Sequence, residues 1–232
     1  MSTATHVALD GSEVTISMEA DLSGYPSSVG VFDVSGYQRE FTAGNLELGQ
    51  WAAREVSGVT LTESYGHQRG VLRIGSRIVS NNLYDGEDRV WVGVWEGKQS
   101  SLVTQLFNLK DSSEVVSLFA AFEIRELPRP CELTLKPMDA RVVADGLPIV
   151  AKEVPNVGLI EINRITNQMI RSVPKHSGTP VRGGELFFAE ATAHFLLLGQ
   201  TTSTTVLPDP GTGHDDVASR VETLTVSWKD PP

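Results

Sequence analysis

The amino-acid sequence predicts an all-β protein built as a barrel or a sandwich, and two observations lead to this prediction. Apolar and polar residues alternate in many short segments, which is the period-two pattern of strands with one buried face. The dipeptides Asp10-Gly11, Asp85-Gly86, Asp145-Gly146 and Gly183-Gly184 lie between such segments and tolerate positive φ, as turns require. No continuous helical pattern and no internal repeat is visible in the sequence.

The predicted strands run from one end of the chain to the other. The segments 12–19 and 57–64 alternate throughout, whereas the segment 90–96 is apolar on both faces and is predicted to be an interior strand. Further strands are predicted at 71–79, 102–107, 115–125, 132–135, 159–165, 186–188, 202–207 and 221–228.

Two short helices are predicted between these strands. Asn45 is a suitable N-cap for the segment 45–55, in which Leu46, Trp51 and Ala52 form a weak apolar stripe interrupted by Gly49. The second helix is predicted over 164–171. Short helices between strands are compatible with an all-β fold.

Three prolines, Pro128, Pro130 and Pro137, mark a candidate domain boundary in the middle of the chain. Proline cannot donate to a strand ladder, so this stretch is either an edge strand or a crossing between two β units. We predict a β-barrel unit at residues 1–127 and a second β unit at residues 128–232. An inserted domain and a single elaborated barrel are the alternatives. Residues 206–216, rich in Pro, Gly and Asp, are predicted to form an exposed loop.

The charge of the chain is strongly unbalanced. Asp and Glu total 29 and the formal net charge is −10, while only six of the 19 basic residues are lysines. Such a surface repels its own copies at low ionic strength, and salt near 1 M, with a Debye length of about 3 Å, screens the repulsion. The composition therefore predicts a protein adapted to high salt.

The same charge argues against a nucleic-acid partner, because phosphate binding requires clustered Lys and Arg. The densest basic stretch contains Arg69, Arg73 and Arg77, which would share one face of a strand. These arginines are interpreted as a solvated face or ion pairs, or as a carboxylate contact with a neighbouring subunit. The N-terminal segment lacks the features of a signal peptide, and no segment is predicted to cross a membrane.

Cys131 is the only cysteine, so an internal disulfide is excluded. It is interpreted as a small buried apolar residue, with an intermolecular disulfide as the alternative.

His214, Asp215 and Asp216 are consecutive and offer an imidazole and carboxylate oxygens to a cation. Three neighbouring residues cannot enclose an ion alone, so the segment is either a solvated acidic loop or a cation bridge between two subunits.

No motif of nucleophilic, metallopeptidase or phosphate-binding chemistry occurs in the sequence, and no catalytic residue or cofactor is predicted. Trp91 and Trp95 share a predicted strand face and are interpreted as core residues, with a sugar-stacking platform as the alternative.

As a whole, this acidic, lysine-poor and β-rich chain, with its punctuated segment LPRPCELTLKP, resembles the larger major capsid protein of haloarchaeal icosahedral viruses with an internal membrane. The resemblance rests on the length of the chain and on its acidic, lysine-poor and β-rich character. It assigns no functional role to any individual residue. It implies a jelly-roll β-barrel that stands upright in the capsid, with a second small β-barrel domain stacked on it as a turret.

The resemblance also implies the function. The protein would form capsomers of the virion shell with copies of itself and with a smaller coat protein, above a lipid vesicle, and would catalyse no reaction. A β-sandwich binding module, either lectin-like or a phage-tail receptor-binding domain, is the alternative, and a hydrolase with a spatially assembled site is a third hypothesis.

Overall fold

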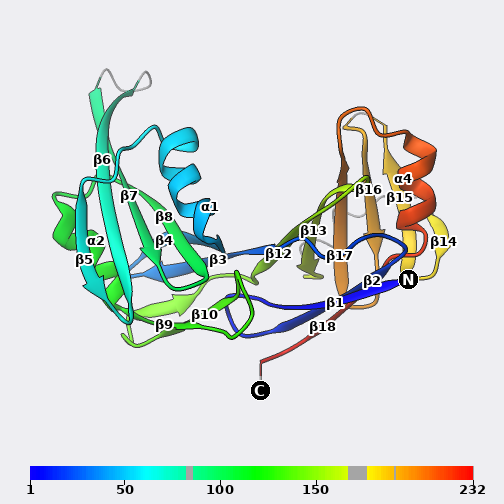
Figure 1. The fold of residues 1–232 in the computed structure, drawn as a ribbon, viewed down its shortest axis with the longest axis horizontal. Helices are drawn as coiled ribbons and strands as arrows, with labels where there is room; N and C mark the ends of the chain where they lie inside the picture. Colours follow the sequence, from blue (N-terminus) through cyan, green and yellow to red (C-terminus); the bar gives the residue numbers. More distant parts are fainter. Residues whose placement is uncertain (82–85, 167–176, 191, 232) are drawn as a thin grey trace. The chain divides into compact units, whose positions relative to one another are not determined.

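The computed structural model describes residues 1–81, 86–166, 177–190 and 192–231. The protein is all-β, with short helices between antiparallel strands, as the sequence predicts (Figure 1). It divides into two compact units. One is discontinuous in sequence and combines residues 1–26 with 147–232, and the other is the inserted unit, residues 27–146.

The discontinuous unit contains two antiparallel sheets around one apolar core. The first sheet has the order β1 (Ser2–Val7), β2 (Glu13–Met18) and β18 (Thr225–Lys229). The second has the order β14 (Thr179–Val181), β15 (Gly184–Ala189), β16 (His194–Leu198), β17 (Thr202–Pro208), β13 (Gly158–Arg164) and β12 (Ile149–Val154). The helix α4 (His214–Val221) adds Val217 and Val221 to this core.

The inserted unit contains a larger sheet and a separate hairpin. The sheet has the order β11 (Val142–Ala144), β3 (Pro26–Val34), β4 (Tyr37–Asn45), β8 (Ser100–Phe107), β7 (Gly86–Glu96), β6 (Gly70–Asn81) and β5 (Glu63–His67). The hairpin consists of β9 (Phe122–Glu126) and β10 (Leu133–Pro137). The helices are α1 (Leu46–Trp51), the π-helical turn η1 (Ala52–Val56) and α2 (Ser112–Ala120).

Strand β7 is covered on both faces, as its sequence predicts. A Cβ at Gly93 would lie 2.8 Å from Val115 of α2, whereas a Cβ at Gly49 of α1 would lie 2.3 Å from Val94. Successive residues of a strand face opposite sides, so α1 and α2 cover opposite faces of β7. Trp91 and Trp95 are buried here, which confirms their interpretation as core residues.

Four phenylalanines fill the interior of the inserted unit. Phe32 of β3, Phe41 of β4, Phe119 of α2 and Phe122 of β9 meet edge to face, with ring centroids 4.9 to 5.9 Å apart. This geometry suits the aromatic quadrupole, so the cluster joins the hairpin and α2 to the sheet.

The side chain of Gln68 ties the turn between β5 and β6 to β9. Its amide nitrogen donates to the Phe122 carbonyl at 2.6 Å, and its amide oxygen accepts from Ile124 N at 2.8 Å. A side-chain amide thus pairs with β9 as a neighbouring strand would.

The boundary predicted between residues 127 and 128 differs from the observed division. β9 and β10 pair Glu126 with Leu133, and Leu127 N donates to Glu132 O, so Pro128 and Pro130 lie in a hairpin turn within the inserted unit. The chain passes between the units after residues 26 and 146 instead. The alternative of an inserted domain is the one that corresponds to this division.

Most predicted strands are confirmed, and three are confirmed only over the C-terminal part of their range. The segment 115–125 is largely helical because α2 ends at Ala120, the segment 57–64 has strand only at its end, and α4 occupies the start of the segment 221–228. The loop predicted at 206–216 is reduced to residues 209–213. The sequence interpretation also missed β1, β3, β4, β11, β12, β14 and β16.

The helix predicted after Asn45 is confirmed, since the Asn45 side chain accepts a hydrogen bond from Leu48 N. The helix predicted over 164–171 lies mainly outside the described residues, and Arg164 itself is the last residue of β13.

Candidate functional site

His214, Asp215 and Asp216 begin helix α4. The His214 ring packs against Phe188 and Phe195, with centroids 4.2 and 5.0 Å away, and its Nδ1 lies 3.2 Å from an Asp215 carboxylate oxygen. Carboxylates in the first turn stabilise the positive end of the helix dipole, which accounts for both aspartates. Across the described ranges, no group of three or more His, Cys, Asp and Glu side chains is arranged to hold a metal ion.

Cys131 is buried in the turn between β9 and β10. Burial, together with the neighbouring Glu132 carboxylate, raises the pKa of its thiol to about 11. The thiolate is the form that reacts and oxidises, so this environment favours the apolar-packing interpretation over the intermolecular disulfide.

We therefore expect Cys131 to react slowly with a thiol reagent in the folded protein and fully after denaturation. A pKa near 11 leaves about one thiol in ten thousand ionised at pH 7. Absorbance of the released thiolate of a disulfide reagent measures the rate, with the urea-denatured chain as the reference. A dimer band on a non-reducing gel of the purified protein would contradict the expectation.

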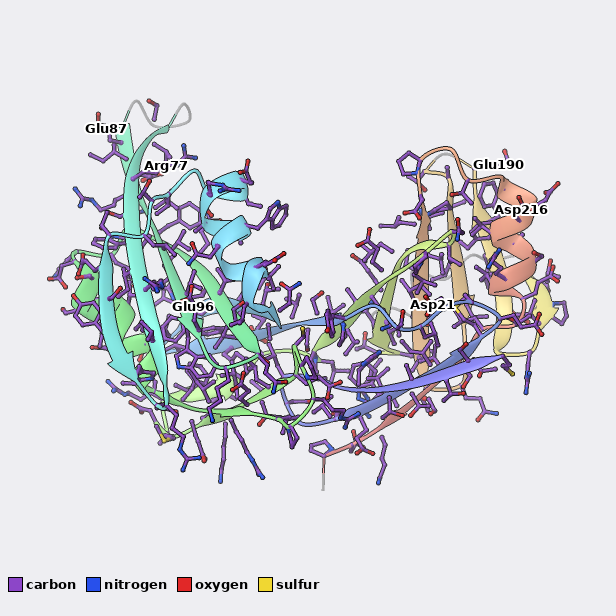
Figure 2. The ribbon with its side chains drawn as sticks, viewed as in Figure 1. Asp21, Arg77, Glu87, Glu96, Glu190 and Asp216 are labelled. Carbon is purple, nitrogen blue, oxygen red and sulfur yellow. The ribbon has the colours of Figure 1, made fainter. Side chains whose placement is uncertain are left out.

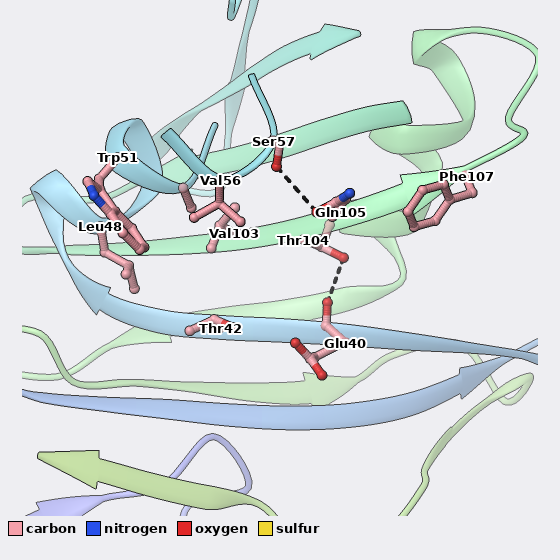
Figure 3. Close-up of a pocket in the computed structure, with 11 residues that line it drawn as sticks. Glu40, Thr42, Leu48, Trp51, Val56, Ser57, Val103, Thr104, Gln105 and Phe107 are labelled. Atoms are coloured by element: carbon pink, nitrogen blue, oxygen red, sulfur yellow. Dashed lines mark hydrogen bonds between the residues drawn. The ribbon is translucent and has the colours of Figure 1, made fainter. Parts of the chain in front are cut away.

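The described surface has a hollowed region around helix α1 of the inserted unit. An apolar groove of about 440 Å³ lies between α1 and strands β4 and β8 (Figure 3). Its walls include Leu48, Trp51, Val56, Val103 and Phe107. Polar groups along β8 are already paired, because Thr104 donates to Glu40 O at 2.6 Å and Ser57 donates to the Gln105 side chain at 3.3 Å.

Local sequence explains why α1 stands where it does. Asn45 caps its first turn, and Ser101 of β8 accepts from Gly49 N at 3.2 Å while donating to Asn45 O at 2.6 Å. Gly49 lets the helix approach β7, since any side chain there would collide with Val94. The helix therefore faces the sheet with Gly49 and Ala53, which are buried.

This placement corrects the apolar stripe predicted for the helix. Leu46 is 39% exposed and Trp51 is 53% exposed, so neither is a core residue. Trp51 projects instead at the rim of the groove, as Figure 3 shows.

A second hollow of about 590 Å³ also borders Trp51, and its lining combines the apolar side chains of Leu46 and Trp51 with polar side chains. It is lined by Glu47, Gln50 and Arg54 from the helical segment, and by Glu96 and Gly97 at the end of β7. Gln50 Nε2 donates to one Glu96 oxygen at 2.5 Å, and Arg73 Nε donates to the other at 2.7 Å. The Glu96 carboxylate is thereby held in one orientation.

The chemistry of the two hollows is stacking and hydrogen bonding. Trp51 lines both of them, and the lining of the second hollow also includes carboxylate, amide and guanidinium groups. This arrangement could not be expected from the sequence, because the apolar stripe that includes Trp51 predicts a helix face turned towards the core.

No protein-family model, curated protein or solved structure matches the chain. Among the described helices, none has both the length and the apolar character needed to span a bilayer.

Proposed function

We propose that the protein is a structural coat protein, the larger of two that build an icosahedral virion shell of the upright single β-barrel type. The observation that supports this proposal best is the nested arrangement of two β units, in which residues 27–146 interrupt a unit formed by both ends of the chain. A turret domain inserted in a shell-forming barrel has this arrangement.

The pairing of the chain ends explains how one unit can accept the other. Ser17 in β2 pairs with Thr225 in β18, so the first sheet of the discontinuous unit joins residues on either side of the insertion. The entropy cost of closing a loop rises only as the logarithm of its length, by about 0.6 kcal/mol per doubling. The shell-forming unit can therefore remain complete while the inserted unit presents separate surfaces to solvent or to neighbouring subunits.

The distribution of charge supports assembly in high salt. Among the described Asp and Glu residues, Glu132 alone is buried, and Figure 2 shows the side chains of Glu87, Glu190 and Asp216 projecting from the ribbon. Carboxylates at the surface bind water strongly and repel those of the next subunit. Salt removes that repulsion without disturbing the apolar cores.

We expect assemblies of the protein with its smaller partner to loosen when salt is removed. Lowering ionic strength from roughly 1 M to 0.1 M extends the Debye length from about 3 Å to about 10 Å, so repulsion reaches across a subunit contact. Electron microscopy and light scattering along a dilution series measure the loss, with sucrose added to match osmotic strength as a control. Particles that stay intact at 0.1 M would contradict the salt argument.

The assembly state in high salt tests the proposal itself. A coat protein co-purifies with a smaller β-rich protein in comparable amounts and forms capsomers that are visible by microscopy. A chain that stays monomeric at high salt in the presence of every co-expressed coat protein would instead favour an isolated binding module.

A further inference from the structure

We propose that the inserted unit carries a site for a neutral saccharide at Trp51. One sugar ring stacks its C–H face on the exposed indole, and its hydroxyls face the polar groups of Glu47, Gln50, Arg54 and Glu96 in the second hollow. The inference goes beyond the proposed coat function, which requires no ligand.

Trp51 differs from the buried tryptophans of the same unit. Trp95 is 1% exposed and Trp91 is 5% exposed, whereas Trp51 is 53% exposed on a helix that the sheet fixes in place. An indole is the largest apolar side chain, and one that remains in water forgoes the burial that the core provides. Its rigid, flat surface is complementary to the C–H face of a pyranose ring.

The backbone after Trp51 is also unusual. The helix continues into the π-helical turn η1, a rare conformation that occurs frequently at functional sites. The turn follows the close contact at Gly49, and Ala53 is buried within it while Arg54 is exposed. Trp51 and Arg54, which are three residues apart and so share a helix face, both line the hollow.

The polar groups around Trp51 are of the kind that recognises vicinal hydroxyls. A carboxylate offers about four acceptor positions, and Glu96 uses one on each oxygen for Gln50 and Arg73. Each Glu96 oxygen can therefore still accept a hydrogen bond from a sugar hydroxyl. The orientation of the carboxylate is already fixed before a sugar binds. Glu47 adds a second acceptor, and the Gln50 and Arg54 side chains add donors.

Charge selects the class of saccharide. Two carboxylates, Glu47 and Glu96, line the hollow, and the Arg54 guanidinium is already 2.6 Å from Glu55. An acidic sugar would meet this negative field and the net charge of −10, so a neutral sugar is preferred. The volume of about 590 Å³ falls within the range of small-ligand sites and is open to solvent, as the end of a longer glycan requires.

The test is a glycan array followed by titration of the full-length protein with neutral and acidic oligosaccharides. We expect binding to neutral glycans, and we expect Trp51→Ala to weaken it about tenfold or more, because the stacking surface is lost. Trp51→Phe keeps a flat ring and should retain most of the affinity. Tyr37→Ala, which removes another exposed aromatic side chain of the same unit, is the matched control.

Gln50→Ala provides a second variant that leaves the indole intact. It removes one donor and one support of Glu96, so affinity should fall while the near-ultraviolet circular dichroism stays unchanged. Absence of binding to any neutral glycan, preference for acidic glycans, or equal affinity of the Trp51→Ala and Tyr37→Ala variants would overturn the proposal.

Assembly of the same variants separates this proposal from the coat function. Loss of glycan binding with capsomers intact supports a dedicated saccharide site. Loss of assembly in Trp51→Ala with glycan binding unchanged would mean that a neighbouring subunit covers the indole, and would overturn the saccharide site alone.

Discussion

Replacing Phe122 with alanine is expected to destabilise the inserted unit by about 3–5 kcal/mol. Phe122 is 1% exposed, and its ring lies 4.9 Å from that of Phe32 and 5.1 Å from that of Phe41. Truncation removes these edge-to-face contacts and leaves a cavity between β3, β4 and β9. The surrounding strands cannot close that cavity, because their backbones are fixed by pairing within the sheet and the hairpin.

Tryptophan fluorescence in a urea titration measures this effect selectively. Trp51, Trp91 and Trp95 all belong to the inserted unit and Trp228 to the other, so the signal reports mainly on the inserted unit. Phe107→Ala is the matched control, since its ring is 51% exposed and its loss should change the midpoint little. Phe122→Leu should fall between them. Equal midpoints for Phe122→Ala and Phe107→Ala would show that the buried ring of Phe122 stabilises the unit no more than the exposed ring of Phe107 does.

Helix α2 was predicted as a strand, although its sequence also carries the pattern of a helix. Val115, Leu118 and Phe119 follow a spacing of three and four residues, which is the period of a helix face, and all three are buried in α2. Asp111 caps the helix by accepting from Ser113 N at 2.9 Å, and Glu114 accepts from Lys110 N at 2.8 Å. The high β propensity of Val115 and Val116 was outweighed by this cap and by the packing of Val115 and Phe119 against Gly93.

The nested division of the chain could not be predicted from local patterns. Strand β2 pairs with β18 some 200 residues later, and a contact of that range leaves no mark on the composition of either strand. The boundary was predicted from a group of prolines, but Pro128 and Pro130 lie in a hairpin turn. Proline signals a break in strand pairing, whether the break separates two strands or two domains.

The candidate site was hidden for a different reason. An amphipathic pattern shows that a helix has an apolar face, but the closest approach to the sheet is made by Gly49 and Ala53, the smallest residues present. Close packing through small residues turned the larger Leu46 and Trp51 outwards. The Asn45 cap, which depends on local hydrogen bonding alone, was predicted correctly.

Replacing Glu126 with alanine is the second substitution with a large expected effect, about 2–3 kcal/mol of stability. The Glu126 carboxylate at the end of β9 accepts from Lys98 N at 3.0 Å, Gln99 N at 2.6 Å and Ser100 N at 2.8 Å. These amides form the tight turn between β7 and β8. A carboxylate that fills a ring of backbone N–H groups stabilises them more strongly than neutral acceptors do.

Glu126→Gln separates the charge from the shape of this contact. Its amide oxygen can still accept from Gln99 N and Ser100 N, but its NH₂ group then faces the Lys98 N–H, which is also a donor. We expect it to lose about half as much stability as Glu126→Ala. Glu123→Ala removes the same charge from an exposed position on the same strand and is the matched control, measured at the same salt concentration.

The turn that Glu126 holds also borders the second hollow at Trp51, because Glu96 and Gly97 line that hollow. Loosening the turn should therefore increase hydrogen exchange at residues 97–100 and weaken saccharide binding, with Trp51 itself unchanged. Glu123→Ala should do neither. If Glu126→Ala and Glu123→Ala unfold at the same urea concentration, water satisfies the turn amides as well as the carboxylate does, and Glu126 has no part in positioning Glu96.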